Sequence, residues 1–170
     1  MTEPESVREV WRGRYLTLTV ECWPESTEYE VLRKHHAVAI VPVTPNGDVL
    51  LVRQLRQPVR RELLEIPSGL LDVDGEDPEA CATRELLEET GFRHETIEFL
   101  GGCLLSPGYT DEYQHLFMAR TEERPTGEPE PGIELVRRPF SEIVTEARTG
   151  RIEDAKTALA LLLADAHGAP

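Results

Sequence analysis

Hydrophobic residues recur with two different periods along the chain, and these periods divide it into expected strands and helices. Runs rich in β-branched and aromatic residues predict strands at residues 11–21, 29–33, 36–43, 48–56, 62–67, 95–105, 113–120 and 133–140. Apolar positions at helical spacing, with capping residues, predict helices at residues 78–90, 141–148 and 154–166. Residues 121–132 are rich in Pro, Gly and Glu and predict a loop. Mostly strands with helices interspersed predict a mixed α+β domain.

Composition indicates a globular protein of one domain. A chain of 170 residues is long enough to bury a core, and 39% hydrophobic with 29% charged residues is ordinary for a soluble protein. No apolar run approaches the ~18–20 residues of a membrane span, and the polar N-terminus does not resemble a secretory signal. Cys22, Cys81 and Cys103 lack metal-type spacing and leave one cysteine unpaired, so we expect a cytoplasmic location.

The formal net charge is −14, which argues against nonspecific binding to nucleic acid or membrane. We therefore expect neither as a partner. A phosphate-bearing substrate would need local positive charge, either from basic side chains or from metal ions.

The helix expected at residues 78–90 has clear boundaries in the sequence. Asp77 can cap it, Pro78 suits its first position, and Gly91 suits a left-handed residue after its end. The positions expected on its buried side are Ala80, Thr83, Leu86 and Leu87.

Three glutamates of this helix, Glu85, Glu88 and Glu89, stand at i, i+3 and i+4 and so share one face. Like charges at this spacing repel by roughly 0.2–0.5 kcal/mol per pair. One interpretation is a solvated surface. The other is a site for a hard cation, since Mg²⁺ and Mn²⁺ prefer carboxylate and carbonyl oxygens. A bound metal would also relieve the repulsion.

Residues 69–92 resemble the signature of the Nudix hydrolases: Gly, five residues, Glu, seven residues, then Arg-Glu-apolar-any-Glu-Glu-any-Gly-apolar. Residues 84–92 match its end in full, and seven residues separate Glu76 from Arg84. The start of the segment departs from the signature, because six residues rather than five separate Gly69 from Glu76. The effect of this one-residue insertion stays open. The resemblance implies that Arg84 orients a glutamate and that Glu76 braces the loop.

The resemblance also implies a metal site and a reaction. It implies two or three Mg²⁺ (or Mn²⁺) ions, held by Glu85 and Glu89 with help from Glu88 and the backbone carbonyl of Ser68. The implied reaction is hydrolysis of a diphosphate linked to another group. Metal ions suit it because they neutralise the substrate and activate water.

Two further features resemble the ADP-ribose pyrophosphatase branch. Pro107, within SPGYTDE at residues 106–112, lies about where that branch carries a marker proline, although a tight turn between strands is an equal alternative. Residues 52–56 and 150–161 also look like this branch, so the resemblance runs from about residue 11 to 164. It implies hydrolysis of ADP-ribose to AMP and ribose 5-phosphate.

This resemblance implies the Nudix fold, a mixed β-sheet sandwiched between α-helices. Residues 1–36 would form an N-terminal strand region that pairs two subunits into a homodimer. Residues 37–170 would form the catalytic domain.

The only basic cluster in the sequence of this acidic chain is formed by four of its 18 basic residues, Arg53, Arg56, Arg60 and Arg61. Arginine is the natural bidentate partner of phosphate. Arg56 matches an arginine of the branch and is the first candidate for binding substrate, followed by Arg53. The alternative is that these arginines only neutralise neighbouring glutamates.

An adenine needs an aromatic or apolar stacking surface. Tyr29, Tyr15 and Trp23 are candidates from the N-terminal region, with packing in a core or a dimer as the alternative. Tyr29 joins Arg56, Arg53 and Pro107 as a proposed substrate-binding residue.

Members of the branch recruit a general base from an acidic loop beyond the signature, and residues 121–134 resemble that loop. Glu130 is the first candidate and Glu128 the second, since prolines leave the match ambiguous by one residue. Glu88 is the candidate if the loop supplies no base. A merely solvated loop is the alternative.

Other functions remain open from the sequence. The substrate could be another nucleoside diphosphate sugar or an oxidised nucleotide. A non-catalytic nucleotide-binding module on the same fold is a different class, and it would be expected to have lost metal-ligand positions. All three helix glutamates are present, which counts against that class.

Overall fold

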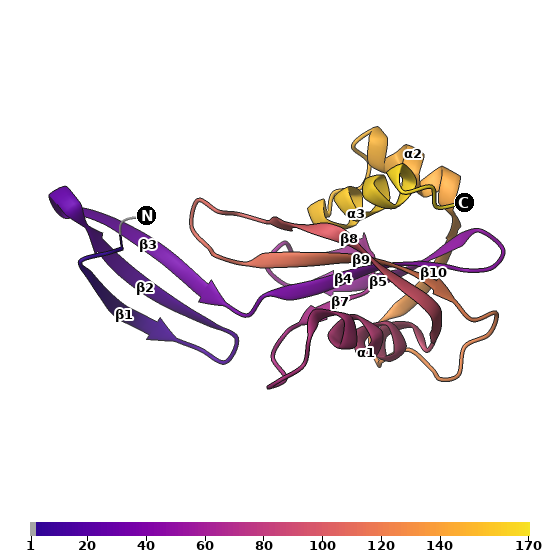
Figure 1. Ribbon diagram of the computed structural model, residues 1–170, viewed down its shortest axis with the longest axis horizontal. Helices are drawn as coiled ribbons and strands as arrows, with labels where there is room; N and C mark the ends of the chain where they lie inside the picture. The colour runs from indigo at the N-terminus through magenta and orange to yellow at the C-terminus, as the bar shows by residue number, and fades with distance from the viewer. Residues whose placement is uncertain (1–2) are drawn as a thin grey trace.

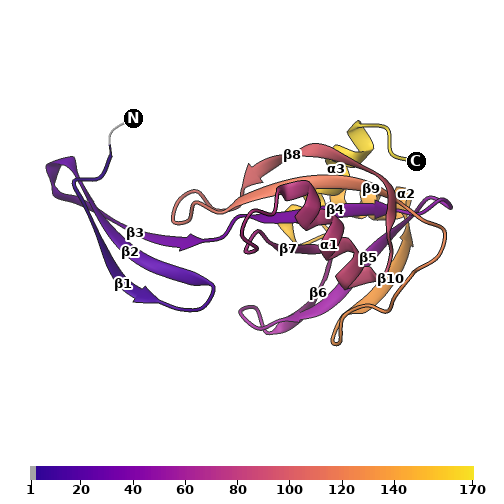
Figure 2. The same cartoon turned by 60° about the horizontal axis from the view of Figure 1, so that its bottom comes forward.

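The computed structural model describes residues 3–170 and contains two β-sheets. The first sheet is formed by β1 (Ser6–Arg12), β2 (Leu16–Trp23) and β3 (Thr27–Lys34), paired antiparallel in chain order. A short 3₁₀ turn, η1 (Pro24–Ser26), joins β2 to β3. Figures 1 and 2 show this N-terminal sheet standing clear of the rest of the molecule.

The second sheet has seven strands in the order β10-β5-β4-β9-β8, with β6 beside β5 and β7 beside β4. Its strands are β4 (Ala37–Val43), β5 (Asp48–Arg56), β6 (Arg61–Glu65), β7 (Ser68–Leu70), β8 (His94–Leu104), β9 (Tyr113–Thr121) and β10 (Glu134–Pro139). Only the β4–β9 pair is parallel among these described strands, so the sheet is mixed.

Helices cover both faces of the seven-stranded sheet. Helix α1 (Pro78–Thr90) lies on one face, while α2 (Phe140–Arg148) and α3 (Ala155–Ala166) lie on the other (Figure 1). The α+β fold with a mixed sheet between helices, expected from the sequence, is confirmed. No helix among residues 3–170 is both long and apolar enough to cross a membrane.

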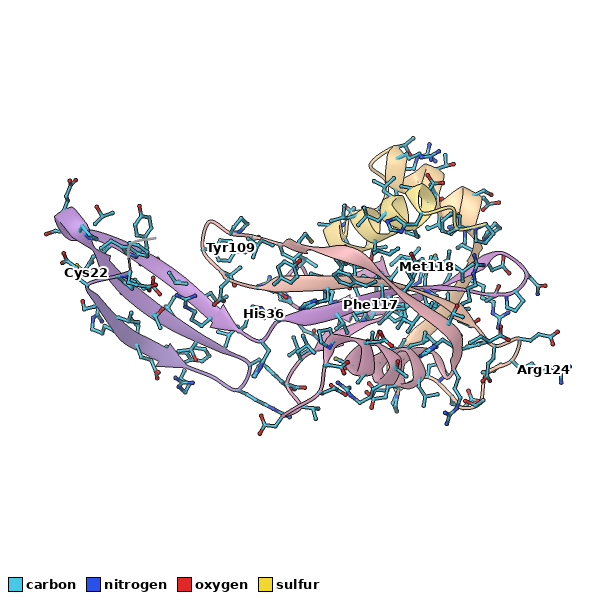
Figure 3. The ribbon with its side chains drawn as sticks, in the orientation of Figure 1. Cys22, His36, Tyr109, Phe117, Met118 and Arg124 are labelled. Atoms are coloured by element: carbon cyan, nitrogen blue, oxygen red, sulfur yellow. The ribbon has the colours of Figure 1, made fainter. Side chains whose placement is uncertain are left out.

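The central strands are buried on both faces, which explains why their sequences are apolar at successive rather than alternate positions. Every residue of β4 is buried, because its side chains enter two cores in turn. In β9, Phe117 packs in the core beneath α1 and Met118 packs in the core beneath α2 and α3 (Figure 3). The two faces of one sheet therefore support two separate helical layers.

Two features of the strands differ from the sequence prediction. The strand expected at residues 11–21 is two strands, because the chain turns at residues 13–15, where the Gly13 N–H donates to the Leu16 carbonyl at 2.9 Å. A side chain at Gly13 would meet the end of the Trp11 ring, so this glycine leaves room for the ring in its present position. β7 was not predicted, since three residues are too few to show a period.

The loop between β8 and β9, residues 105–112, extends from the seven-stranded sheet and contacts β3 of the N-terminal sheet. The Leu32 N–H donates to the Tyr109 carbonyl at 2.7 Å, and Arg33 and Lys34 form ion pairs with Asp111 at 2.6 Å and Glu112 at 2.8 Å. Figure 3 shows Tyr109 on this loop, on the side of the N-terminal sheet. The contacts hold the end of β3 against the loop.

Candidate active site

Helix α1 has the boundaries that its sequence predicted. The Asp77 side chain accepts a hydrogen bond from the Ala80 N–H at 2.8 Å, and Pro78 opens the helix. Gly91 ends it with φ at 74° and donates its N–H to the Leu87 carbonyl at 2.8 Å. These caps fix the orientation of the helix and so of its glutamates.

The buried side of α1 differs from the prediction. Of the four positions expected there, only Leu86 is fully buried, while Ala80 and Thr83 are exposed and Leu87 is half-buried. The residues actually buried are Cys81, Ala82, Leu86, Glu89 and Thr90. The helix is therefore rotated so that part of its glutamate face turns inward. The interpretation of these glutamates as a fully solvated surface is wrong.

Glu85 and Glu89 lie against β7. The Glu89 carboxylate accepts a hydrogen bond from the Ser68 N–H at 2.9 Å, and its residue is only 7% exposed. A Cβ at Gly69 would overlap the Glu85 carboxyl group, so this glycine makes room for the glutamate. The backbone of Ser68 and Gly69 therefore packs directly on two of the three glutamates.

Burial controls the charge of these two carboxyl groups. Loss of solvent raises the pKa of Glu89 to about 7, with the negative charge of Glu85 adding to the effect. Burial also raises the pKa of Glu85, even though Arg84 opposes the shift. Both shifts therefore come mainly from burial, which disfavours the charged form of each carboxyl group.

Arg84 binds three glutamates at once. Its guanidinium donates to Glu76 at 2.9 and 3.0 Å, to Glu85 at 2.6 Å and to Glu88 at 2.9 Å. The pKa of Glu76 is held below its usual range by the hydrogen bonds from Arg84. Arg84 thereby ties the loop before α1 to the glutamate face of the helix.

The acidic loop folds back onto the end of α1. The Thr126 and Gly127 N–H groups donate to the Gly91 carbonyl at 2.8 and 3.2 Å, and the Glu130 N–H donates to the Glu88 carbonyl at 2.9 Å. A side chain at Gly91 would collide with the Gly127 backbone. Glu130 is close enough to Glu85 for its charge to contribute to the raised pKa of that residue.

A cleft of about 540 Å³ opens beside Ser68 and Gly69. Arg56, Lys34 and Lys156 line it, and the Asp154 and Glu112 side chains lie at its wall. Its size is typical of a small-molecule site. We call it the cationic cleft, because it gathers three basic side chains of an acidic protein next to the backbone that contacts Glu85 and Glu89.

A buried carboxylate fixes two of these cations. Glu65 is 1% exposed and accepts hydrogen bonds from Arg56 at 2.7 and 2.6 Å and from Lys156 at 2.5 Å. Burial alone would raise the pKa of Glu65, but the hydrogen bonds and charges of Arg56 and Lys156 outweigh it and hold this pKa below its usual range. Both cations are thus held at the cleft with little freedom.

A second cleft, of about 620 Å³, lies between the N-terminal sheet and the 105–112 loop. Trp23, Tyr29, Pro107 and Tyr109 are among its lining residues, and we call it the aromatic cleft. Trp23 and Tyr29 meet edge to face, with ring centroids 6.4 Å apart. The 105–112 loop contributes to both clefts, so they are neighbours.

A sequence model of the NUDIX domain matches residues 33–161, more than half of the chain. The chain belongs to the Nudix hydrolase family. The resemblance drawn from residues 69–92 is confirmed, and α1 is the helix of the Nudix signature.

Several named relatives are similar to this chain over most of their length. The "Methanol dehydrogenase activator" of Bacillus methanolicus is 32% identical over 161 residues, and the "ADP-ribose pyrophosphatase" of Bacillus subtilis (strain 168) is 31% identical over 161 residues; each match covers 90% of this chain and 86% of the relative. The "GDP-mannose pyrophosphatase" of Yersinia enterocolitica is 37% identical over 147 residues, covering 80% of this chain and 76% of the relative.

A solved structure shares the Nudix fold of this chain. It is described as "Crystal structure of ADP compounds hydrolase" and superposes with a TM-score of 0.77 at 25% identity. The match covers 99% of this chain and 96% of that chain, so it includes the N-terminal sheet as well as the seven-stranded sheet.

The residues around the Nudix helix fit a divalent metal ion chemically. Glu85, Glu88, Glu89 and the Ser68 carbonyl offer only oxygen, which Mg²⁺ and Mn²⁺ prefer, and the buried negative charge would be relieved by a cation. Among residues 3–170, no three His, Cys, Asp or Glu side chains are gathered as a ready-made metal site. Arg84 offers a reason, since it engages Glu85 and Glu88.

The predicted substrate residues fall into three places. Arg56 lines the cationic cleft, and Tyr29 and Pro107 line the aromatic cleft. Arg53 lies outside both and pairs with Glu134 across the β5–β10 ladder at 3.4 Å. Residues three apart in a strand point to opposite faces, which explains why Arg53 and Arg56 separate.

Two residues of the Nudix site were missed from the sequence. The interpretation that the arginines only neutralise neighbouring glutamates did not single out Glu65, which is buried and anchors Arg56. Lys156 joins the same carboxylate from 91 positions away in the sequence. One signal was present, since Lys156 is the single charged residue of the otherwise apolar or neutral run 155–164.

Proposed function

We propose that this Nudix protein hydrolyses the diphosphate of ADP-ribose to AMP and ribose 5-phosphate with the help of divalent metal ions. The observation that carries the proposal is the adjacency of three environments: the glutamates of α1, the cationic cleft and the aromatic cleft. A nucleotide sugar has the matching parts, namely a charged diphosphate, a polar sugar and a flat base. The names of the Bacillus subtilis relative and of the similar solved structure support this substrate class.

Glu85, Glu88, Glu89 and the Ser68 carbonyl would hold Mg²⁺ or Mn²⁺, two or three ions in all. When bound, such ions neutralise the diphosphate and lower the pKa of a coordinated water. The direct contacts of Ser68 and Gly69 with Glu89 and Glu85 support this grouping.

The protein's own side chains then have distinct roles in the proposal. Arg56 and Lys156 bind the phosphate oxygens, since Glu65 holds both at the cleft. Glu130 takes the proton of the water that attacks phosphorus, and the bridging P–O bond breaks to release two monophosphates. Glu128 is the second candidate for this base and Glu88 the third. Arg53 stays the second candidate after Arg56 for binding substrate, although it lies outside both clefts.

The base of the nucleotide would occupy the aromatic cleft. Tyr29 and Trp23 provide aromatic surface there, and Pro107 brings the 105–112 loop against them. Aromatic side chains favour flat ligands through stacking and edge contacts. The N-terminal sheet would therefore contribute to the substrate site as well as to assembly.

The proposal extends to domains, assembly and location. Residues 1–36 form an N-terminal region that pairs two copies into a homodimer, and residues 37–170 form the catalytic domain. All seven residues of β1 are exposed, which supports a surface made for a second copy. Three free cysteines support a reducing, cytoplasmic environment.

Another nucleoside diphosphate sugar is the alternative substrate, and the relative named GDP-mannose pyrophosphatase favours it. The same glutamates and cations would serve any diphosphate. The two substrates share the diphosphate and differ in the base, in the sugar and in the sugar carbon that carries the diphosphate. They therefore test the clefts rather than the metal site.

A panel of nucleotides tests the proposal. ADP-ribose, ADP-glucose, GDP-mannose, ATP and GTP are incubated with Mg²⁺ or Mn²⁺, and the products are identified by chromatography. We expect AMP and ribose 5-phosphate, with ADP-ribose turned over fastest. Glu85→Gln is the control for the metal site and should lose metal affinity and most activity, because it removes a charged ligand. Faster turnover of ATP or GTP than of ADP-ribose would contradict the proposal.

A further inference from the structure

Gln114 lines the cationic cleft but belongs neither to the proposed metal site nor to the phosphate-binding cations. It lies near the start of β9, and Ser68, Gly69 and Arg56 line the same cleft. It is nevertheless 1% exposed, so its side chain lies at the floor of the cleft rather than at its mouth.

The position of Gln114 in the sheet would suit an apolar residue. Alternate residues of β9 share a face, and Leu116 and Met118, on the same face as Gln114, belong to the core beneath α2 and α3. Gln114 pairs with Ala37 on β4 and with Cys103 on β8. Gln114 is therefore a polar residue on a strand face whose next two residues, Leu116 and Met118, are apolar core residues.

The amide nitrogen of Gln114 is not satisfied by the described part of the protein. Its Nε2 atom is buried and has no hydrogen-bond partner among the described residues. A buried donor without a partner is costly, and replacement by an apolar side chain of similar shape is often neutral or stabilising. An unsatisfied amide at the floor of a cleft is explained if a ligand supplies the partner.

The chemistry of the cleft indicates which part of a ligand this is. Phosphate oxygens have Arg56 and Lys156 as charged partners, so a neutral amide adds little for them. A sugar hydroxyl both accepts and donates hydrogen bonds and matches an amide in both respects.

The register of the sheet places Gln114 at a suitable distance. Leu70 on β7 pairs with Ala37 on β4, and Ala37 pairs with Gln114. Neighbouring strands are about 4.8 Å apart, so Gln114 lies roughly 10 Å across the sheet from the strand that contacts the glutamates. This separation leaves room for a group attached to the diphosphate.

We propose that Gln114 is a positioning residue that hydrogen-bonds a sugar hydroxyl of the nucleoside diphosphate sugar and so contributes to the choice of sugar. This inference rests on the proposed function and names the contact that reads the sugar within the same site. Gln114 acts on the orientation and affinity of the substrate, while the reacting atoms are served by the glutamates.

Two matched substitutions test this role. Gln114→Met keeps the length and approximate volume of the side chain and removes its hydrogen bonds. Gln54→Met makes the same chemical change on β5, at the other glutamine whose Nε2 is buried without a partner, and Gln54 is outside the cationic cleft. The measurements are kcat and KM for ADP-ribose, the affinity for ADP by calorimetry, and the melting temperature.

We expect Gln114→Met to raise KM for ADP-ribose about 2- to 13-fold, the effect of one neutral hydrogen bond, with kcat little changed. The affinity for ADP, which keeps the ribose of adenosine but lacks the terminal ribose, should stay within about twofold because the phosphate contacts persist. The melting temperature should be unchanged or higher, because a buried unsatisfied group is removed. Gln54→Met should leave KM at the wild-type value.

Each other outcome overturns the inference in a distinct way. Equal KM values for the two variants, or an equal loss of ADP and ADP-ribose affinity, would show that Gln114 does not contact the sugar. A lower melting temperature with unchanged KM would assign it a structural role. If the wild-type protein hydrolyses no nucleoside diphosphate sugar, the proposed function fails, and this inference fails with it.

Discussion

A single glycine decides how close the backbone comes to the glutamates of α1. Gly69 has no side chain, and the Glu85 carboxyl group occupies the space where a Cβ would be. Gly69→Ala must therefore displace either the carboxylate or β7. We expect metal affinity and kcat to fall at least 10-fold, since a ligand moved by even about 1 Å loses productive geometry.

Metal titration monitored by calorimetry, together with steady-state kinetics, measures this effect. Gly127→Ala is a suitable control, because a Cβ at Gly127 would meet only the Gly91 Cα, at 4.0 Å. Gly127→Ala should leave metal affinity and kcat near their wild-type values. Wild-type metal affinity in Gly69→Ala would mean that Glu85 is not held by this contact.

Glu130 is the residue whose chemistry is most open to a direct test. Its backbone is bound to the Glu88 carbonyl at 2.9 Å, so the acidic loop carries it to the glutamate face. A positioned carboxylate that removes a proton contributes typically ~10²–10⁴-fold. Glu130→Gln should lower kcat by about that factor while ADP-ribose and metal affinities stay nearly intact.

The neighbouring glutamates provide the comparison for Glu130. Glu128→Gln should reduce kcat less, and Glu122→Gln should be close to neutral, because Glu122 instead donates its N–H to the Arg93 carbonyl, beyond the end of the helix. If Glu128→Gln, Glu130→Gln and Glu134→Gln all leave kcat within a few-fold, the base lies outside this loop. Glu88 would then be the candidate to test.

At the scale of elements, one buried carboxylate joins β5, β6 and α3. Glu65 on β6 holds Arg56 on β5 and Lys156 on α3. Glu65→Gln would leave two cations without their counter-charge, and removing one partner of a buried pair costs about 3–5 kcal/mol. Because 38% of the Arg56 side chain is exposed, we expect a smaller loss, about 2–3 kcal/mol.

The same carboxylate predicts a dependence on pH. The pKa of Glu65 is lower in the folded protein than its ordinary value, so its stabilisation is present at neutral pH. It is lost as the pH falls below the ordinary range of Glu, about 4.3, toward the lowered pKa of the folded state. The difference in unfolding free energy between wild type and Glu65→Gln should therefore shrink in acid.

Urea unfolding at several pH values measures that difference. Glu153→Gln is the matched control, since Glu153 pairs with Arg61 on the surface, where both side chains are more than half exposed. Exposed pairs contribute about 0–1 kcal/mol, so this variant should be nearly as stable as wild type. Equal stability of the two variants would contradict the anchoring role of Glu65.

The elements show what local sequence can and cannot predict. The caps of α1 at Asp77 and Gly91 were predictable, because capping depends on residues a few positions apart. The buried side of the helix was misjudged at Ala80 and Thr83, because the rotation of a helix is set by the sheet beneath it. Glu65 and Lys156 meet only in the fold, so their pairing had no local signal.

At the scale of the whole molecule, the N-terminal sheet exposes the apolar residues of its first strand, β1. The residues it buries are largely polar, and they include Thr17, Thr19 and Glu21. Val7, Val10 and Trp11, in contrast, are about half exposed on β1. A three-stranded sheet usually needs an apolar face packed against something for stability, and within one chain these side chains are not covered.

A second copy of the chain is the partner that we propose for this surface. Exposed apolar side chains on an edge strand such as β1 are typical of a strand that contacts another chain. The solved Nudix structure matches this chain over 99% of its length, so its fold includes the same N-terminal region. Burying β1 in a homodimer would cover the apolar side chains and fix the wall of the aromatic cleft to which β2 and β3 contribute.

The homodimer is tested by placing a charge on this surface. Val10→Lys should shift sedimentation from dimer toward monomer at micromolar concentration, because a buried unpaired ammonium is strongly unfavourable. Val59→Lys is the control, since Val59 is 51% exposed and Val10 49% exposed, and Val59 lies on the turn between β5 and β6, far along the chain from β1. A wild-type monomer, or a Val10→Lys variant that stays dimeric, would reject β1 as the interface. If Val10→Lys is a monomer and also has a raised KM for ADP-ribose, assembly and the aromatic cleft are coupled through the N-terminal sheet.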